Sequence, residues 1–154
     1  MAVAAWTSLG ASKSDCSELA NEIIDSLLPI PPNASNSRLM RAHWEECLLG
    51  DGWVKGLAVG SSRLSIGYSR GQTGMCIQMG NTSRVYADLL KLETLFRHGS
   101  ISQAVLVVPS EEYSAYLGTN YANYSRAEQD IKAFDPTISV PILLISIDNR
   151  RGKQ

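Results

Sequence analysis

Two continuous apolar runs constrain the fold of this chain more than any other feature. Residues 104–108 read Ala-Val-Leu-Val-Val, and residues 141–147 read Pro-Ile-Leu-Leu-Ile-Ser-Ile. A strand with one face in water alternates apolar and polar residues, whereas a strand covered on both faces is apolar throughout. The two runs therefore predict central strands of a sheet that carries helices on both faces.

Three shorter β-like runs precede these strands, at residues 53–59, 63–68 and 75–79. They are separated by short connections that contain glycine, at residues 60–62 and 71–74. Connections as tight as these predict antiparallel neighbours. We therefore expect a three-stranded meander beside the two buried strands.

Apolar residues recur at helical spacing in four segments. In residues 82–98, Val85, Leu89, Leu92 and Phe96 share one face, and Gly99 provides a natural stop. The other three helices are predicted at residues 15–28, 38–49 and 125–134. The resulting order of helices and strands, ααβββαβαβ, predicts an α/β protein with a mixed sheet and helices on both faces.

Three segments show neither pattern. Residues 1–14 are small and polar with an isolated Trp6, and we expect a loosely held arm. Residues 29–37 are rich in Pro, Asn and Ser, which is typical of a connector. We expect the Tyr-rich region at residues 113–124 to be a half-buried loop or a face for another protein chain. The predicted organisation is an N-terminal arm, helix and connector over residues 1–36 and a core domain over residues 37–154.

The composition excludes several classes of protein. With 44% hydrophobic residues, 19% charged residues and a net charge of −1, the chain is typical of a soluble globular domain, and any surface for nucleic acid must be local. Its three cysteines are widely spaced and contain no CxxC pair, so we predict neither a disulfide framework nor a zinc site. No apolar run approaches the ~20 residues of a membrane span. We expect a cytoplasmic protein with no membrane partner.

The most distinctive motif is a strand that ends in Gln78-Met-Gly-Asn81 and leads directly into a helix containing Asp88-Leu-Leu-Lys91. It resembles the BglII/BamHI-type restriction endonucleases, in which an acidic strand residue is followed by Gln or Glu, an aromatic residue, Gly-Asn, and a helix reading Asp-Leu-Leu-Lys. Gly52-Trp53 and Val108-Pro-Ser110 are similar to further places in that family. The resemblance spans roughly residues 38–148 and implies a restriction-endonuclease-like αβββαβ core.

The resemblance implies a PD-(D/E)XK nuclease core, which in that family cleaves duplex DNA with magnesium. Such chemistry needs an Asp on one strand, a Glu on the next, and a third group two residues later that positions the attacking water. On this chain the three positions fall at Gly67, Cys76 and Gln78. Glycine has no ligand atom, a thiolate is too soft for magnesium, and residues 52–87 contain no Asp or Glu. We therefore predict no metal site and no cofactor, with magnesium required only if the chain is active.

Other polar residues are candidates for the missing roles. Glu45 and Glu46 are the nearest replacement acids, although both lie outside the apolar stripe of their helix and are typical of a solvated pair. Asp88 is the third replacement acid, and it lies three residues from Lys91, which is consistent with an ion pair or with phosphate contact by the lysine.

The start of the same helix carries the remaining candidates. Asn81 and Arg84 stand where the helix dipole favours a phosphate, so Asn81, Arg84 and Lys91 are the predicted DNA-binding residues. A lone Cys76 at a strand position is typical of a small buried apolar residue.

Three functions follow from these interpretations. The leading one is a pseudo-nuclease, in which a restriction-endonuclease-like domain has lost hydrolysis and contacts duplex DNA or a protein partner, including a second copy of itself. The second is an active magnesium-dependent type II endonuclease in which Glu45, Glu46 or Asp88 replaces the lost acids. The third is a purely structural subunit of a larger assembly that makes no DNA contact.

Overall fold

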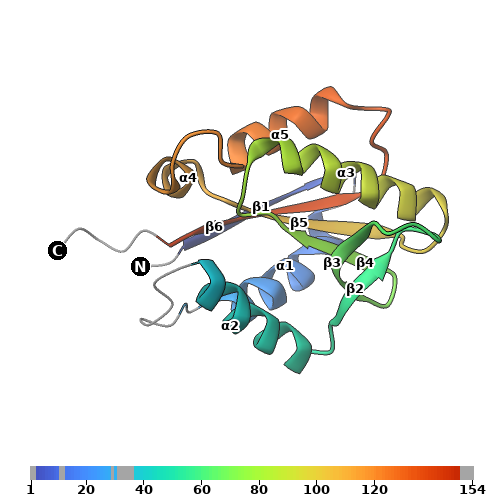
Figure 1. Cartoon of the computed structure of the whole chain (residues 1–154). Helices are drawn as coiled ribbons and strands as arrows, with labels where there is room; N and C mark the ends of the chain where they lie inside the picture. The colour runs from blue at the N-terminus through green and yellow to red at the C-terminus, as the bar shows by residue number, and fades with distance from the viewer. Residues whose placement is uncertain (1–2, 11–12, 29, 31–36, 150–154) are drawn as a thin grey trace.

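The computed structural model describes residues 3–10, 13–28, 30 and 37–149, which form one mixed sheet with helices on both faces (Figure 1). The strands are β1 (Val3–Leu9), β2 (Val54–Ala58), β3 (Ser65–Arg70), β4 (Thr73–Ile77), β5 (Gln103–Pro109) and β6 (Ile142–Asp148). The helices are α1 (Lys13–Leu27), α2 (Ser37–Gly50), α3 (Thr82–Arg97), α4 (Glu111–Leu117) and α5 (Tyr124–Ala133).

The six strands lie in the order β1-β6-β5-β4-β3-β2. β2, β3 and β4 form the predicted antiparallel meander, whereas β4, β5 and β6 run parallel to one another. Parallel neighbours need a crossover, which α3 supplies between β4 and β5 and the α4–α5 segment supplies between β5 and β6. The predicted α/β class with a mixed sheet is confirmed.

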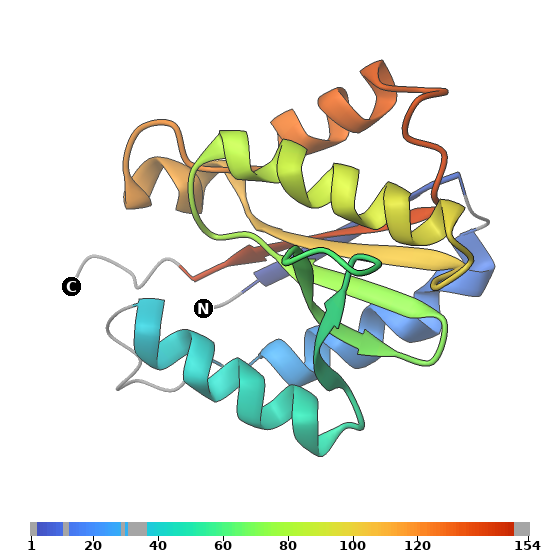
Figure 2. The same cartoon turned by 45° about the vertical axis from the view of Figure 1, so that its right-hand side comes forward.

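Two hydrophobic clusters fill the space between the sheet and its helices. α3 and α5 cover one face, and α1 and α2 cover the other (Figure 2). Along β5 the side chains of Leu106 and Val107 belong to opposite clusters, which explains why this strand is apolar along its central positions. On the second face, the fully buried Trp44 of α2 donates its indole N–H to the Leu27 carbonyl of α1 at 2.9 Å.

The N-terminal segment differs from the loose arm expected from the sequence. Residues 3–9 form β1, an edge strand that pairs antiparallel with β6 from Val3↔Asp148 to Leu9↔Ile142. The partner strand lies far away in the sequence, so no local pattern revealed the pairing. β1 and α1 therefore contribute to the same sheet and core as residues 37–149, and residues 31–36 of the expected connector lie outside the described residues.

The Tyr-rich segment also differs from the loop that was expected. Residues 111–117 form α4, whose first turn carries two glutamates and whose N-terminus is capped by Ser110, which accepts a hydrogen bond from the Tyr113 N–H at 3.1 Å. Seven residues are too few to show a helical repeat. Tyr113 is buried, while Tyr116 is exposed. None of the described helices is long and apolar enough to cross a membrane.

Candidate functional site

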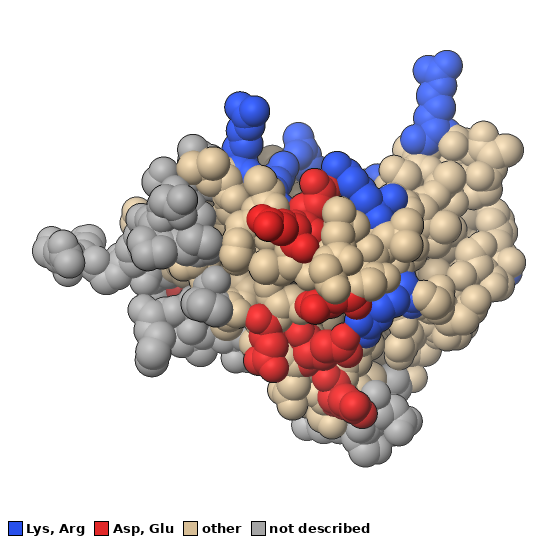
Figure 3. Space-filling model, turned by 90° about the horizontal axis from the view of Figure 1, so that it is seen from below, with Lys and Arg blue, Asp and Glu red and all other residues tan. Residues whose placement is uncertain are grey.

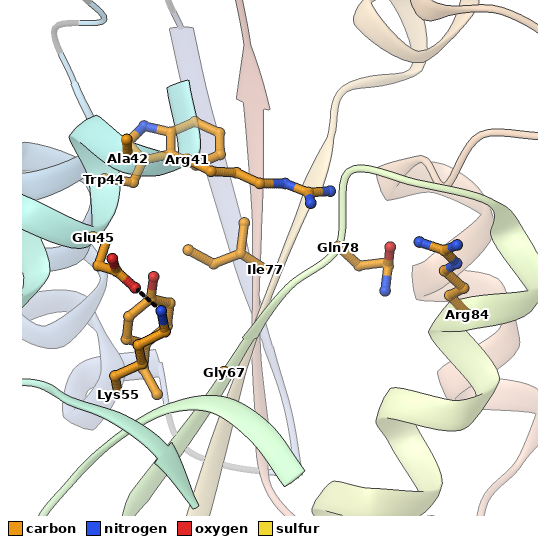
Figure 4. Close-up of a pocket in the computed structure, with 10 residues that line it drawn as sticks. Arg41, Ala42, Trp44, Glu45, Lys55, Gly67, Ile77, Gln78 and Arg84 are labelled. Atoms are coloured by element: carbon orange, nitrogen blue, oxygen red, sulfur yellow. Dashed lines mark ion pairs between the residues drawn. The ribbon is translucent and has the colours of Figure 1, made fainter. Parts of the chain in front are cut away.

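A pocket of about 460 Å³ lies between α2, the meander and the start of α3. Its walls come from α2, β2, β3, the end of β4 and the first turn of α3, as Figure 4 shows. The lining residues are Arg41, Ala42, Trp44 and Glu45 of α2, Lys55 of β2, Gly67 and Tyr68 of β3, Ile77 and Gln78 at the end of β4, and Arg84 of α3. The structure thus brings Gly67, Gln78, Glu45 and Arg84, four residues singled out in the sequence, to one place.

Gln78 is held by two hydrogen bonds. Its Nε2 donates to Asp88 Oδ2 at 2.8 Å, and its Oε1 accepts from the Gly80 N–H at 3.1 Å. A Cβ atom added at Gly80 would lie 3.0 Å from that same Oε1, so the glycine of the Gly-Asn motif lets the chain turn tightly around the amide. Both the nitrogen and the oxygen of the Gln78 amide therefore have a hydrogen-bond partner within the protein.

Asp88 is buried on α3, and its carboxylate contacts Gln78 directly. Burial raises its pKa, while the hydrogen bond from Gln78 and the charges of Lys91 and Arg84 oppose the rise. The Lys91 ammonium lies 4.0 Å from Asp88 Oδ1, which is long for an ion pair. Asp88 is thus a desolvated carboxylate whose oxygens already have partners.

Cys76 is a buried apolar residue, as predicted. Its side chain is 4% exposed and packs in the cluster beneath α3. Burial raises the pKa of the thiol, the neighbouring Asp88 charge raises it further, and a hydrogen bond from the Gly67 backbone opposes the shift. The thiol therefore stays protonated near neutral pH and carries no charge for a cation.

The other two replacement acids lie in different environments. Glu45 reaches the pocket, where its Oε1 forms an ion pair with Lys55 Nζ at 2.7 Å. Glu46 is exposed and lies outside the pocket lining.

Of the three predicted DNA-binding residues, one lines the pocket and two do not. Arg84 lines the pocket, whereas Asn81 is the N-cap of α3 and its Oδ1 accepts from the Ser83 N–H at 2.8 Å. Lys91 is half-buried beside Asp88 and does not line the pocket.

Arg41 was not among the residues predicted from the sequence. It lies four positions before Glu45 on α2, and residues four apart share a helix face, so placing Glu45 near the strands also places Arg41 there. Tyr68 and Lys55 were overlooked because they enter through the pairing of β2 with β3, in which Lys55 stands opposite Tyr68. That register is set by tertiary structure and leaves no local signal.

The family model described as restriction endonuclease BglII/BglIII matches residues 11–147 of the chain. This chain belongs to that family. The match begins before the connector, which agrees with the place of α1 in the common core. Among curated protein sequences, none matches this chain.

Solved structures of BglII share the fold of this family member. The crystal structure of BglII complexed with a DNA 16-mer superposes with a TM-score of 0.77 at 13% sequence identity, over 98% of this chain and 78% of that chain. Free BglII gives a TM-score of 0.72 at 15% identity, over 98% of this chain and 82% of that chain. The resemblance and the fold inferred from the motif at residues 77–92 are confirmed.

At the positions to which the resemblance assigns the metal ligands, the side chains present do not fit magnesium. Magnesium takes several oxygen ligands in octahedral geometry, usually with at least one free carboxylate. Here Gly67 has no side chain and Cys76 holds a protonated thiol, so neither position supplies an oxygen ligand. Within residues 3–10, 13–28, 30 and 37–149, no group of three or more His, Cys, Asp or Glu side chains is placed to hold a metal ion.

Proposed function

We propose that this chain is a pseudo-nuclease of the BglII family that has lost magnesium-dependent hydrolysis and binds duplex DNA with the pocket face. One observation carries the proposal. The pocket is lined by Gly67 and Gln78, two of the three positions to which the resemblance assigns catalytic residues, yet two arginines line it, and the acid that lines it, Glu45, is paired with Lys55. The pocket therefore presents net positive charge, where a metal-dependent nuclease would present free carboxylates.

Loss of hydrolysis follows from the chemistry of the site. A metal-dependent nuclease lowers the pKa of a bound water and neutralises charge that develops on the phosphate. Gly67 and Cys76 supply neither of the two carboxylates for this role, and Gln78 is held by Asp88 and Gly80. Among the described residues, none in the pocket offers a free carboxylate to activate water.

Charge distribution supports DNA contact at the pocket. Acidic side chains gather on the face formed by α1 and α2 (Figure 3). Exposed acids on these elements and the turn that follows are Glu18, Glu22, Asp25, Glu46 and Asp51. Lys and Arg side chains border these acids in Figure 3, and Glu22 is paired with Arg70. DNA is a dense polyanion, so the unpaired acids of this face disfavour its approach, whereas the arginines at the pocket attract it. The relative BglII has been crystallised with a DNA 16-mer, which also supports DNA as the partner.

The test is a gel-shift assay with a mixture of random-sequence duplexes at low salt, run with magnesium and with EDTA. We expect the duplex to be retarded in both conditions and to stay intact in the magnesium lanes. Magnesium-dependent cleavage by the homogeneous protein would overturn the loss of hydrolysis. Failure to retard any duplex at low salt would favour the structural-subunit alternative.

An active enzyme with displaced acids is the competing candidate, and the Gln78–Asp88 contact favours Asp88 for that role. In that case Asp88→Ala abolishes cutting while the protein stays folded, and Glu46→Ala leaves cutting unchanged because Glu46 lies away from the pocket. Our proposal predicts no cutting by the wild type or by either variant. Cleavage by the wild type that disappears only in Asp88→Ala would establish the competing account.

A further inference from the structure

The pocket lining carries an excess of positive charge. Three cations, Arg41, Lys55 and Arg84, face one carboxylate, Glu45, which leaves a net charge of +2. Glu45 and Lys55 neutralise each other through their 2.7 Å ion pair. The excess therefore resides on the two arginines, one from α2 and one from α3.

The two guanidinium groups are available for a ligand. Within the part of the chain that the structure describes, neither guanidinium forms a hydrogen bond or a close ion pair, and the charge of Arg84 acts on the buried Asp88 carboxylate, whose pKa it lowers. In Figure 4 the Arg41 side chain extends from α2 toward Gln78, and Arg84 lies beyond Gln78 on α3. Arg84 packs over the Gly80 turn, where an added Cβ atom would lie 3.4 Å from its Nη1. Two like charges that share a pocket repel each other, and an anion between them removes the repulsion.

We infer that this pocket binds one phosphate group of the DNA backbone directly, between Arg41 and Arg84, without a metal ion. The inference rests on the proposed function and specifies how the same site works. The guanidinium fork matches the oxygens of a phosphate, and the two arginines supply the two positive charges that a divalent cation would bring. Arg41 and Arg84 thus replace the metal as the means of holding the phosphate.

The neighbouring groups allow such a phosphate to approach. On the α3 side, the acid beside Gln78 is Asp88, which is buried and satisfied by Gln78 and Lys91. Gly67 adds no side chain to the pocket and leaves space at the position to which the resemblance assigns an acid. The remaining polar lining residue, Tyr68, has a pKa raised chiefly by burial, so it stays neutral and does not repel an anion.

The experiment measures binding of a fluorescent duplex in EDTA by anisotropy, over a range of salt. We expect Arg41→Ala and Arg84→Ala each to weaken binding by about tenfold and to reduce the salt slope by about one contact. Arg63→Ala is the matched control, because Arg63 is exposed in the turn between β2 and β3 and does not line the pocket. Thermal unfolding of each variant shows whether the fold is retained.

The possible outcomes distinguish this inference from the proposed function. If the wild type binds DNA in EDTA and both pocket variants bind equally well, the inference fails while DNA binding stands. If binding appears only with magnesium, the metal-free mode is wrong. If no duplex binds, the proposed function and a DNA phosphate both fail, and NMR titration with inorganic phosphate then decides the ligand. Shifts of the Arg41 and Arg84 Nε–H signals would reassign the pocket to a free phosphate ion.

Discussion

Gln78 at the end of β4 donates a 2.8 Å hydrogen bond to Asp88 in the second turn of α3. In the family pattern the residue at the Gln78 position orients the attacking water. Here its amide instead joins strand to helix and satisfies a buried carboxylate. The contact gives Gln78 a structural role at the junction of β4 and α3.

Asp88 makes the folded protein sensitive to pH. Burial raises the pKa of Asp88, so the folded state holds its proton more tightly than the unfolded chain does. This group's contribution to the unfolding free energy therefore falls as the pH rises from the ordinary value of 3.8 through the raised pKa.

Asp88→Asn removes the charge and keeps an oxygen that accepts from Gln78. We expect the variant to match or exceed the stability of the wild type at neutral pH, by up to ~1 kcal/mol, with the difference shrinking toward pH 3.8. Urea unfolding at several pH values measures this. A variant that is less stable than the wild type at neutral pH by ~1 kcal/mol or more would contradict this explanation.

Glu93 has the opposite pH dependence. Burial opposes its ionisation, but hydrogen bonds from Ser139, Val140 and Arg97 outweigh that effect and hold the pKa of Glu93 below its usual value. The stability that Glu93 contributes is present above the unfolded value of 4.5 and is lost as the pH falls through the lowered pKa.

Glu93→Gln leaves backbone N–H groups before β6 with a weaker acceptor. We expect a loss of about 2 kcal/mol in unfolding free energy at neutral pH and a flatter acid limb. Glu128→Gln, which breaks a more exposed pair on α5, is the control and should change stability by less than ~0.5 kcal/mol. Equal losses in the two variants would show that the Glu93 contacts have no special weight.

The three cysteines should differ in reactivity. Cys16 and Cys76 are buried, whereas Cys47 is half-buried with its Sγ 3.7 Å from His43 Nε2. Reactivity follows exposure and thiolate character, so we expect one thiol of the native protein to react quickly with Ellman's reagent and the other two to react only on unfolding. Cys47→Ser should abolish the fast phase. Fast reaction at Cys76 would contradict its burial.

Much of this fold could be predicted from local sequence, and the exceptions share a cause. The buried strands β5 and β6 are continuous apolar runs, and the helix α3 carries a helical repeat, so each can be recognised from a short stretch of sequence. β1 owes its position to pairing with β6, at the other end of the chain. The helix α4 has only seven residues, which is less than two helical turns. Neither property is visible in a local window.

The candidate site shows the same division. The motif around Gly80 identified the strand–helix junction and Gln78 because those residues are adjacent in the chain. The Glu45–Lys55 pair and the presence of Arg41 and Arg84 in one pocket depend on how α2 packs beside the meander. Charge at the pocket is therefore a tertiary property, and the sequence alone indicated two of its charged residues, Glu45 and Arg84, without showing that they share a pocket.

Introducing acids at positions 67 and 76 tests the proposal that this chain lacks a metal site. A Cβ atom added at Gly67 would have the Met75 carbonyl oxygen as its nearest neighbour, at 3.5 Å, so Gly67→Asp fits the backbone. We expect the Gly67→Asp/Cys76→Glu double variant to bind Mg²⁺ in calorimetric titration, because it returns two carboxylates beside Gln78.

The matched control for that variant is Gly67→Asn/Cys76→Gln, which has the same size without the charges. Equal heats in the two double variants would show that these positions do not meet at a metal site. Thermal unfolding checks that the carboxylate introduced at position 76 has not unfolded the core, since the Cys76 side chain that it replaces is only 4% exposed.

The loss of magnesium-dependent hydrolysis can be examined by calorimetric titration of Mg²⁺ and Mn²⁺ into the wild-type protein, alone and with bound duplex. We expect no heat from the protein alone, no heat beyond that of the free duplex when DNA is bound, and intact DNA in the calorimeter sample afterwards, because no free carboxylate of the described residues lines the pocket. Saturable metal binding accompanied by cleavage of the recovered duplex would contradict the pseudo-nuclease proposal and would show that other acids of the chain form an active site.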